Sequence, residues 1–239
     1  MKTRTFLITG ASKGIGRSLA DRLARRGHQV VGLARSSDAS FPGKLVSVDL
    51  SDLQQTEAAL SELRGTFKFD GLVNNVGLVK PQRIGEVQIE DLDAVLGANL
   101  HPAVQAMQAL LPGMRETGWG RVVNISSLTV LGAFERTAYA AAKAALISFS
   151  RSWALELATT GITVNTVAPG PTETELFRKN SPPGSVGEKR FLSSVPMNRF
   201  GKPDEIAAAI EFLLSEDAAF ITGQALFVDG GASVGRSLV

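Results

Sequence analysis

The chain contains no cysteine, and only two histidines occur among its 239 residues. Disulfide bonds, thiolate zinc sites and cysteine nucleophiles are therefore excluded. His28 and His101 lie far apart in the sequence, and neither stands at metal-ligand spacing from another candidate ligand. His28 follows Gly27 at a predicted helix end, where a cation suits the helix dipole. The sequence thus predicts no metal site, which disfavours metal-dependent dehydrogenase chemistry.

Long apolar runs and charge excess are also missing. No run approaches the roughly 18 apolar residues of a membrane-spanning helix, and the N-terminus MKTRTFLITG lacks a signal-peptide pattern. We therefore expect a soluble, cytoplasmic protein with no membrane partner. Basic and acidic residues nearly balance, 25 against 23. The one basic run, residues 17–27, is interpreted as a solvated helix face, so no nucleic-acid partner is expected.

Apolar strand-like runs alternate with helical patterns along the whole chain. A chain that is 44% hydrophobic and of this length can bury one large core, so we expect a single domain over residues 1–239. The predicted strands are 5–10, 29–34, 45–50, 71–75, 121–126, 162–170 and 225–231. The predicted helices are 15–27, 51–64, 88–117, 137–160 and 203–216. Continuous apolar strands separated by helices predict an α/β fold, with a parallel sheet covered on both faces.

One stretch of the sequence, residues 175–200, is irregular and rich in Pro, Gly and Ser. It falls between the last two predicted strands. Long loops in compact domains are usually functional or mobile. We expect this loop to cover the carboxyl ends of the strands, where ligands bind in such sheets.

A glycine-rich turn follows the first predicted strand. Gly10, Gly14 and Gly16 form G-x-x-x-G-x-G before a helix, and the segment also contains Ser12, Lys13 and Ile15. Glycines permit a tight turn and close backbone approach, and the helix N-terminus offers N–H groups to a pyrophosphate. The alternative is a tight strand-to-helix connection without a ligand. The strand before the turn and the amphipathic helix after it favour dinucleotide binding.

The end of the second predicted strand bears on the choice of cofactor. An acidic residue there would bind the adenosine ribose and favour NAD. The sequence instead reads GLARSS, with Arg35 and no acid, and Lys13 adds a second cation in the glycine turn. Two cations suit a 2′-phosphate. We therefore predict NADP(H), with NAD(H) as the alternative if Arg35 is merely a solvated loop residue.

The single tyrosine of the chain, Tyr139, stands four residues before Lys143 in the run RTAYAAAKAALISF. Residues i and i+4 share one face of a helix. A tyrosine has a pKa of about 10, and a nearby cation favours the phenolate. The pair is therefore a candidate proton donor with its activating ammonium. A buried tyrosine beside a solvent-seeking lysine is the alternative for an isolated Y-x-x-x-K.

Further motifs accompany this pair. The sequence contains GRVVNISS, GLVNNVG, GANLHP, VPMNRFGKPDEIA and ITGQALFVDGG. With the glycine turn and Y-x-x-x-K, they resemble the compact form of the short-chain dehydrogenase/reductase family over essentially the whole chain. The resemblance implies one doubly wound Rossmann domain with a parallel seven-stranded sheet. It also implies hydride transfer between a nicotinamide and a ketone or secondary alcohol.

The resemblance assigns catalytic roles. Tyr139 would be the general acid in ketone reduction. Lys143 would lower the pKa of Tyr139, hold the nicotinamide ribose and join a proton relay that includes Asn99. A serine would polarise the substrate carbonyl. The cofactor contacts that it implies are Gly10, Ser12, Lys13, Gly14, Ile15, Gly16, Arg35, Asp49, Leu50, Asn75, Gly77, Tyr139, Lys143, Pro169, Gly170, Thr172 and Thr174.

Two serines compete for the catalytic position. The family serine usually stands 13 residues before the tyrosine, which here is Ser126. Alignment on the strand G-R-V-V-N-I-S-S selects Ser127 instead. Side chains alternate along a strand, so only one of the two can face the substrate. We predict Ser127, with a one-residue deletion before Tyr139, and keep Ser126 as the alternative.

The substrate is the least determined part of the prediction. The overall pattern is most similar to 3-oxoacyl-carrier-protein reductases, whose carrier-using members have basic docking residues where this chain has Gly118 and Thr160. Arg115, Arg121 or Lys179 could substitute for them. The predicted substrate contacts are Ser127, Leu128, Phe134, Tyr139, Phe177 and Phe191, with Met197 nearby. This apolar set favours a small free ketone or diketone over a carrier-linked thioester.

Two further hypotheses belong to other classes. A non-catalytic member could bind NADPH as a sensor or structural protein, although such proteins tend to lose part of the Asn–Ser–Tyr–Lys set. A dehydratase or epimerase is disfavoured by the short C-terminal region. Family precedent also implies a homotetramer built through residues 88–117 and 137–160 and the C-terminal strand.

Overall fold

The structure, a computed structural model, describes residues 2–235. The strands are β1 (Thr5–Thr9), β2 (Gln29–Ala34), β3 (Lys44–Ser47), β4 (Gly71–Asn74), β5 (Gly120–Ile125), β6 (Ile162–Pro169) and β7 (Ala225–Val228). The longer helices are α1 (Gly14–Arg25), α2 (Leu53–Thr66), α3 (Ile89–Thr117), α4 (Thr137–Leu157) and α7 (Pro203–Leu214). None of the helices within residues 2–235 has the length and apolar character needed to span a bilayer.

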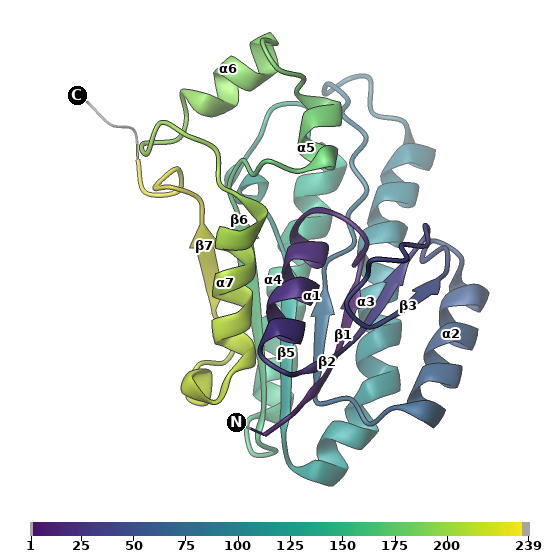
Figure 1. Ribbon diagram of the computed structural model, residues 1–239. Helices are drawn as coiled ribbons and strands as arrows, with labels where there is room; N and C mark the ends of the chain where they lie inside the picture. The colour runs from purple at the N-terminus through teal and green to yellow at the C-terminus, as the bar shows by residue number, and fades with distance from the viewer. Residues whose placement is uncertain (1, 236–239) are drawn as a thin grey trace.

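The seven strands form one parallel sheet in the order β3-β2-β1-β4-β5-β6-β7 (Figure 1). The strand order reverses between β1 and β4, which is where open α/β sheets bind their ligands. All carboxyl ends meet at one edge. The predicted α/β fold with a parallel seven-stranded sheet is therefore confirmed.

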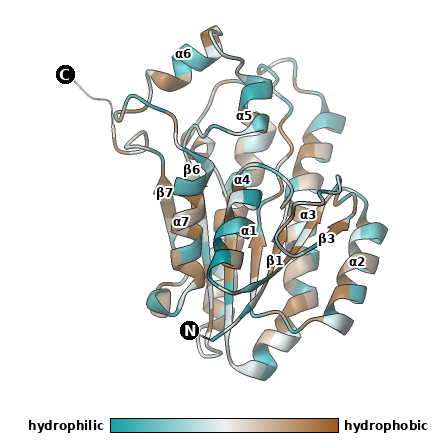
Figure 2. Ribbon diagram, in the orientation of Figure 1, coloured by the Kyte–Doolittle hydropathy of each residue, from teal (hydrophilic) through white to brown (hydrophobic). Residues whose placement is uncertain are grey.

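Helices cover both faces of the sheet, and each face has its own apolar cluster. Helices α1 and α7 pack together on one face, while α2, α3 and α4 pack on the other. Every residue of β5 and β6 is buried, because helices lie on both sides of these strands. Figure 2 shows the apolar strands inside and the polar helix faces outside.

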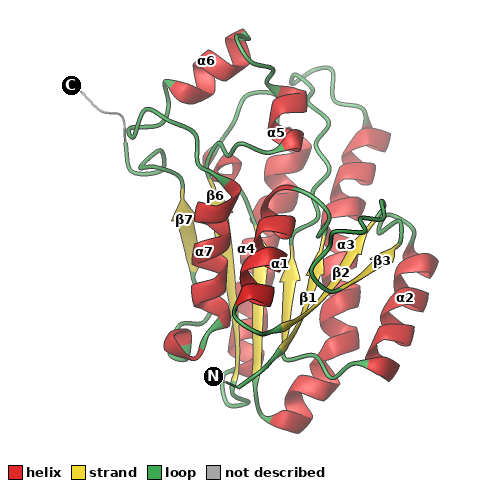
Figure 3. Ribbon diagram, viewed as in Figure 1, coloured by secondary structure: helices red, strands yellow, loops and turns green. Residues whose placement is uncertain are grey.

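The segment 175–200 is more ordered than its composition predicted. It contains two short helices, α5 (Glu175–Asn180) and α6 (Val186–Leu192), above the carboxyl ends of the strands (Figure 3). Thr174 and Ser185 cap them, accepting hydrogen bonds from Phe177 N and Glu188 N. Neither helix has a fully buried residue, so neither shows the apolar periodicity by which sequence reasoning detects helices. We call this segment, residues 175–200, the cap.

Candidate active site

The glycine turn connects β1 to α1 at the point where the strand order reverses. Gly10 and Gly14 adopt left-handed backbone, with φ of 64° and 55°. A Cβ on Gly16 would lie 2.4 Å from the carbonyl oxygen of Gly10, so the turn can close this tightly only around glycine. Gly10 N donates a hydrogen bond to Leu33 O at 2.8 Å, which ties the turn to β2. Ile15 packs against the core cluster under α1.

Lys13, at the start of α1, faces the cap. Its Nζ forms an ion pair with Glu175 Oε2 at 2.5 Å, and both side chains are more than half exposed. An exposed pair of this kind contributes little to stability, so Lys13 can exchange Glu175 for a phosphate at small cost. The expected second cation is therefore in place, but in this structure it pairs with the first turn of α5.

The end of β2 carries an exposed Arg35, which makes no side-chain ion pair among the described residues. Beside it, Ser36 Oγ donates to Ser12 Oγ at 3.3 Å. Asp49 is an acid influenced by the Arg35 charge, but its carboxylate accepts from Ser51 N and Ser51 Oγ. Those bonds, with a smaller effect of the Arg35 charge, hold the pKa of Asp49 below its usual value. Ser36 was not identified from the sequence, although it directly follows the predicted cation.

Leu50 follows Asp49, and its side chain is buried in the core cluster under α2. Any contact of Leu50 with an adenine would therefore come from its main chain. Asn75 lies on the opposite side of β1, just after β4. Its Nδ2 donates to Thr9 O at 3.1 Å and Gly10 O at 3.0 Å. Asn75 thus ties the end of β4 to the glycine turn.

The segment after β6 lies beside the glycine turn. Pro169 ends the strand, and Gly170 N donates to Val228 O at 3.0 Å. A Cβ on Gly170 would lie 2.7 Å from Asp229 Cα. Thr172 is buried and donates its hydroxyl to Gly170 O at 2.9 Å. The methyl group of Thr174 would lie 3.2 Å from a Cβ on Gly14, so this segment and the glycine turn are in close proximity.

The two serines after β5 have different environments. Ser126 is buried, and its hydroxyl donates to the main-chain carbonyl of Lys143 at 2.7 Å. Ser127 is partly exposed, accepts a hydrogen bond from Thr129 N, and precedes the short 3₁₀ turn η1 (Leu128–Leu131). Interaction with the Ser127 hydroxyl lowers the pKa of Tyr139, so this hydroxyl lies near the phenol. The geometry therefore brings Ser127, and not Ser126, to the phenol.

Lys143 is completely enclosed. Its side chain is 2% exposed, and Nζ donates to Val76 O and Ile125 O, each at 3.0 Å. Nζ lies 5.7 Å from the centre of the Tyr139 ring. The carbonyls belong to the ends of β4 and β5, so the amine connects two strands below the phenol. Burial lowers the pKa of Lys143 to about 7.

The pKa of Tyr139 differs from the sequence expectation. Burial raises it to about 12, while the interaction with the Ser127 hydroxyl and the charge of Arg136 oppose that rise. The reason is that a phenolate here would be poorly solvated. The Lys143 amine is buried too and is directed at two carbonyls. In this structure the phenol therefore stays protonated at neutral pH, as a proton donor requires.

Asn99 lies in the middle of α3, facing Lys143. Its Nδ2 donates to Val95 O at 2.7 Å and Leu78 O at 3.0 Å, while its buried Oδ1 has no hydrogen-bond partner in the described residues. A Cβ on Gly77 would lie 3.7 Å from Asn99 Oδ1 and 3.6 Å from Lys143 Nζ. Because Gly77 has no side chain, space for a small group remains beside both atoms, and we call this space the hollow. An unsatisfied buried oxygen needs a donor, and this hollow could hold one.

The remaining predicted substrate residues lie in two segments, the connection from β5 to α4, which we call the rim, and the cap. Leu128 is partly exposed in η1, and Phe134 is 58% exposed in the connection to α4. Phe177 packs against Phe191 with ring centres 5.6 Å apart. Phe200, which was not identified from the sequence, joins them 5.0 Å from Phe177. An aromatic cluster therefore holds α5, α6 and the end of the cap together.

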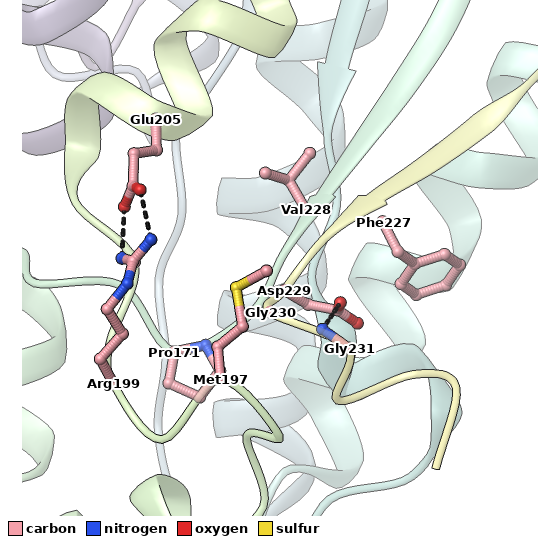
Figure 4. A pocket seen from close by; sticks show the side chains of 10 residues that line it. Pro171, Met197, Arg199, Glu205, Phe227, Val228, Asp229, Gly230 and Gly231 are labelled. Carbon is pink, nitrogen blue, oxygen red and sulfur yellow. Dashed lines mark hydrogen bonds and ion pairs between the residues drawn. The ribbon is translucent and has the colours of Figure 1, made fainter.

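Met197, which was expected near the substrate, is an exposed residue of the cap. It lines a cavity of about 350 Å³ with Pro171, the Arg199–Glu205 ion pair and the segment after β7 (Figure 4). None of the four residues Asn99, Ser127, Tyr139 and Lys143 lines that cavity.

The fold and these residues define a nicotinamide-dependent oxidoreductase of the Rossmann type. A family model described as enoyl-(acyl carrier protein) reductase matches residues 10–233. A 3-oxoacyl-[acyl-carrier-protein] reductase of Escherichia coli is 38% identical over 235 residues, covering 94% of this chain and 95% of the relative. The chain belongs to the short-chain dehydrogenase/reductase family.

Solved structures agree with this assignment. A levodione reductase superposes with a TM-score of 0.91 at 30% identity, covering 99% of this chain and all of its own. A protein named ElxO, solved with NADP bound, superposes with a TM-score of 0.89 at 30% identity. It covers 97% of this chain and 99% of its own length.

Proposed function

We propose that this enzyme reduces a ketone with NADPH, using Tyr139 as the proton donor. The observation that carries the proposal is the meeting of Ser127, Tyr139 and Lys143 at one point beside the hollow at Gly77. Ser127 would donate a hydrogen bond to the carbonyl oxygen, and Tyr139 would protonate that oxygen as it becomes an alcohol. The bound cofactor would supply the hydride.

Lys143 and Asn99 could return a proton to Tyr139 after each reduction. The Lys143 ammonium is a donor whose two carbonyl partners fix its direction. The unpaired Asn99 Oδ1 borders the same hollow and can accept a hydrogen bond from a donor placed there. Both groups suit a relay that resupplies Tyr139. Because all four members of the set are present, a non-catalytic sensor has no specific observation in its favour.

The proposed cofactor preference is for NADP(H), with NAD(H) as the alternative. Arg35 is free to bind a 2′-phosphate, and the hydroxyls of Ser12 and Ser36 lie beside it. Asp49 is the acid that could instead bind a ribose hydroxyl, but its carboxylate already accepts two hydrogen bonds from Ser51. The residues of the glycine turn fit a pyrophosphate, since Gly10 and Gly14 have the required backbone.

The proposed substrate is a small free ketone or diketone. The aromatic cluster in the cap and the rim residue Phe134 favour a compact, partly apolar molecule. The alternative is a 3-oxoacyl-[acyl-carrier-protein], which the 38% identical reductase supports. The positions expected to bear docking charges, Gly118 and Thr160, precede β5 and β6. They therefore lie at the sheet edge opposite Tyr139 and could act on a carrier only at another subunit's site.

We propose that the enzyme acts in the cytoplasm as a homotetramer of single-domain subunits. Leu155 on α4 is 81% exposed, and a shallow cavity of about 240 Å³ lies between α3 and α4, lined by Met107, Leu111 and Trp153. Leu226 on β7, at the open edge of the sheet, is 41% exposed. Apolar surfaces at these two places suit contact with further copies.

The test is NADPH oxidation with a panel of free ketones, diketones and carrier-linked 3-oxoacyl thioesters. We expect kcat/KM for the small carbonyl compounds to equal or exceed that for the thioesters. A strong preference for the carrier-linked substrate that weakens at high salt would instead favour the alternative, because carrier docking is electrostatic. No oxidation with any compound would contradict the proposed activity.

A further inference from the structure

A cation that plays no part in the family pattern stands beside the proton donor. Arg136 is the residue before the first turn of α4, three residues ahead of Tyr139, and its carbonyl accepts from Ala140 N at 2.7 Å. Residues three apart on a helix lie on the same face, about 5–6 Å apart. The side chain of Arg136 is only partly exposed. Its backbone is fixed by a bridge to Gln82.

The guanidinium of Arg136 is largely unused. Its hydrogen bond runs from Nη1 to the main-chain oxygen of Glu135 at 3.2 Å. A guanidinium has five N–H donors, so most of them remain available. Within residues 2–235, no carboxylate forms an ion pair with Arg136, whereas most other partly buried arginines have one.

The adjacent acid is directed elsewhere. Glu135 has left-handed backbone, with φ of 59°, which is uncommon for a residue with a side chain. Its carboxylate accepts from Arg83 Nε at 3.0 Å instead of pairing with Arg136. The chain thus places an acid next to Arg136 and turns its carboxylate away. Backbone strain of this kind is found at ligand-binding positions.

Electrostatics agree with this geometry. Burial lowers the pKa of Arg136, while the charge of Glu135 opposes that fall, and the charge of Arg136 in turn lowers the pKa of Tyr139. An arginine stays charged at any physiological pH, so partial burial without a carboxylate in direct contact is unfavourable. An anion supplied by a ligand would restore the missing interaction, and it would lie close to the group that the phenol protonates.

We propose that Arg136 binds the carboxylate of the substrate, and that the substrate is a free oxo acid. This inference rests on the proposed ketone reduction and names its substrate class. The planar guanidinium matches a carboxylate through two parallel hydrogen bonds. With the ketone oxygen at Ser127 and Tyr139, a carboxylate a few bonds away would reach Arg136. A 3-oxoacyl thioester is neutral at that position and would leave the cation unpaired.

The experiment compares acids with their neutral esters. NADPH-dependent kcat/KM is measured for acetoacetate and methyl acetoacetate, and for levulinate and methyl levulinate, with the wild type, Arg136→Gln and Arg136→Lys. Arg190→Gln is the matched control. Arg190 is an exposed arginine of the cap, and its guanidinium carbon lies 4.5 Å from the centre of the Phe134 ring. Propionate is tested as an inhibitor of methyl acetoacetate reduction.

The wild type should prefer each acid to its ester, and Arg136→Gln should lower that preference by about 10- to 100-fold. The loss should appear mainly in KM, because the carboxylate is not the reacting group. Arg136→Lys should retain part of the preference, and Arg190→Gln all of it. Propionate should inhibit methyl acetoacetate reduction competitively in the wild type, and this inhibition should be lost in Arg136→Gln.

Two results would overturn the inference. The wild type could reduce the esters as efficiently as the acids, or Arg136→Gln could lower acid and ester turnover equally. A shared loss together with a shifted pH profile would show that Arg136 acts only through the pKa of Tyr139. Reduction of neutral ketones without a preference for acids would reject this inference alone. No reduction of any compound would reject the proposed function as well.

Discussion

Ser126 donates its hydroxyl to the main-chain carbonyl of Lys143 at 2.7 Å. The bond joins the end of β5 to the helix that carries both Tyr139 and Lys143, and it leaves Ser126 buried. The next residue, Ser127, points toward the phenol. The two hydroxyls therefore have separable effects.

Ser127→Ala should lower kcat/KM by more than tenfold relative to Ser126→Ala, since a hydrogen bond to a developing charge is lost (about 2 kcal/mol). Ser126→Ala should instead lower the free energy of unfolding by about 1 kcal/mol. Steady-state kinetics and urea unfolding of both variants measure the two effects. The opposite ranking in activity would place the catalytic hydroxyl at Ser126.

Tyr139→Phe should abolish most turnover and leave NADPH binding nearly intact. The phenyl ring keeps its packing against Val95, Ala138 and Ala142 but has no proton to give. General acid catalysis contributes about 10²–10⁴-fold, and a loss of that order is expected in kcat. NADPH fluorescence titration serves as the binding control. Turnover close to wild type would remove Tyr139 from this role.

Arg35→Asp should weaken NADPH binding and improve the relative use of NADH. The new carboxylate repels a 2′-phosphate but can accept from a ribose hydroxyl. Arg64→Asp on α2 is the control, because it makes the same change in net charge at another exposed arginine. Dissociation constants for both cofactors give the comparison. Equal affinity of the wild type for NADH and NADPH would contradict the predicted preference.

Ketone reduction should weaken as the pH rises through about 7. Burial lowers the pKa of Lys143 to that value, so its ammonium is present below it and is lost above it. Tyr139, with a pKa raised to about 12, keeps its proton over the same range and cannot cause the decline. The measurement is kcat/KM for reduction from about pH 6 to about pH 9.

Lys143→Arg separates the lysine from other titrating groups in that pH experiment. A guanidinium keeps its charge, so the decline near pH 7 should vanish even if overall activity is lower. A wild-type rate that stays level to about pH 9 would mean that Lys143 retains its proton during catalysis.

The local sequence determined the sheet and the helices that cover it. The strand range 29–34 was predicted without error, and the ends of the other predicted strands and helices fall within three residues of those observed. Buried parallel strands are continuously apolar, so composition and length identify them. The cap was less predictable. Helices α5 and α6 bury no complete face, and their order depends on N-terminal capping hydrogen bonds and on aromatic contacts within the segment, such as that between Phe177 and Phe200.

The candidate site divides in the same way. The spacing of Tyr139 and Lys143 and the glycine turn are local patterns, and the sequence by itself identified them. Only the tertiary structure decided which serine meets the phenol, because that depends on how β5 packs against α4. It alone directed Glu135 toward Arg83 and left Arg136 without a carboxylate beside Tyr139. Charge pairing joins segments far apart in the chain, so no local pattern records which cation is left unpaired.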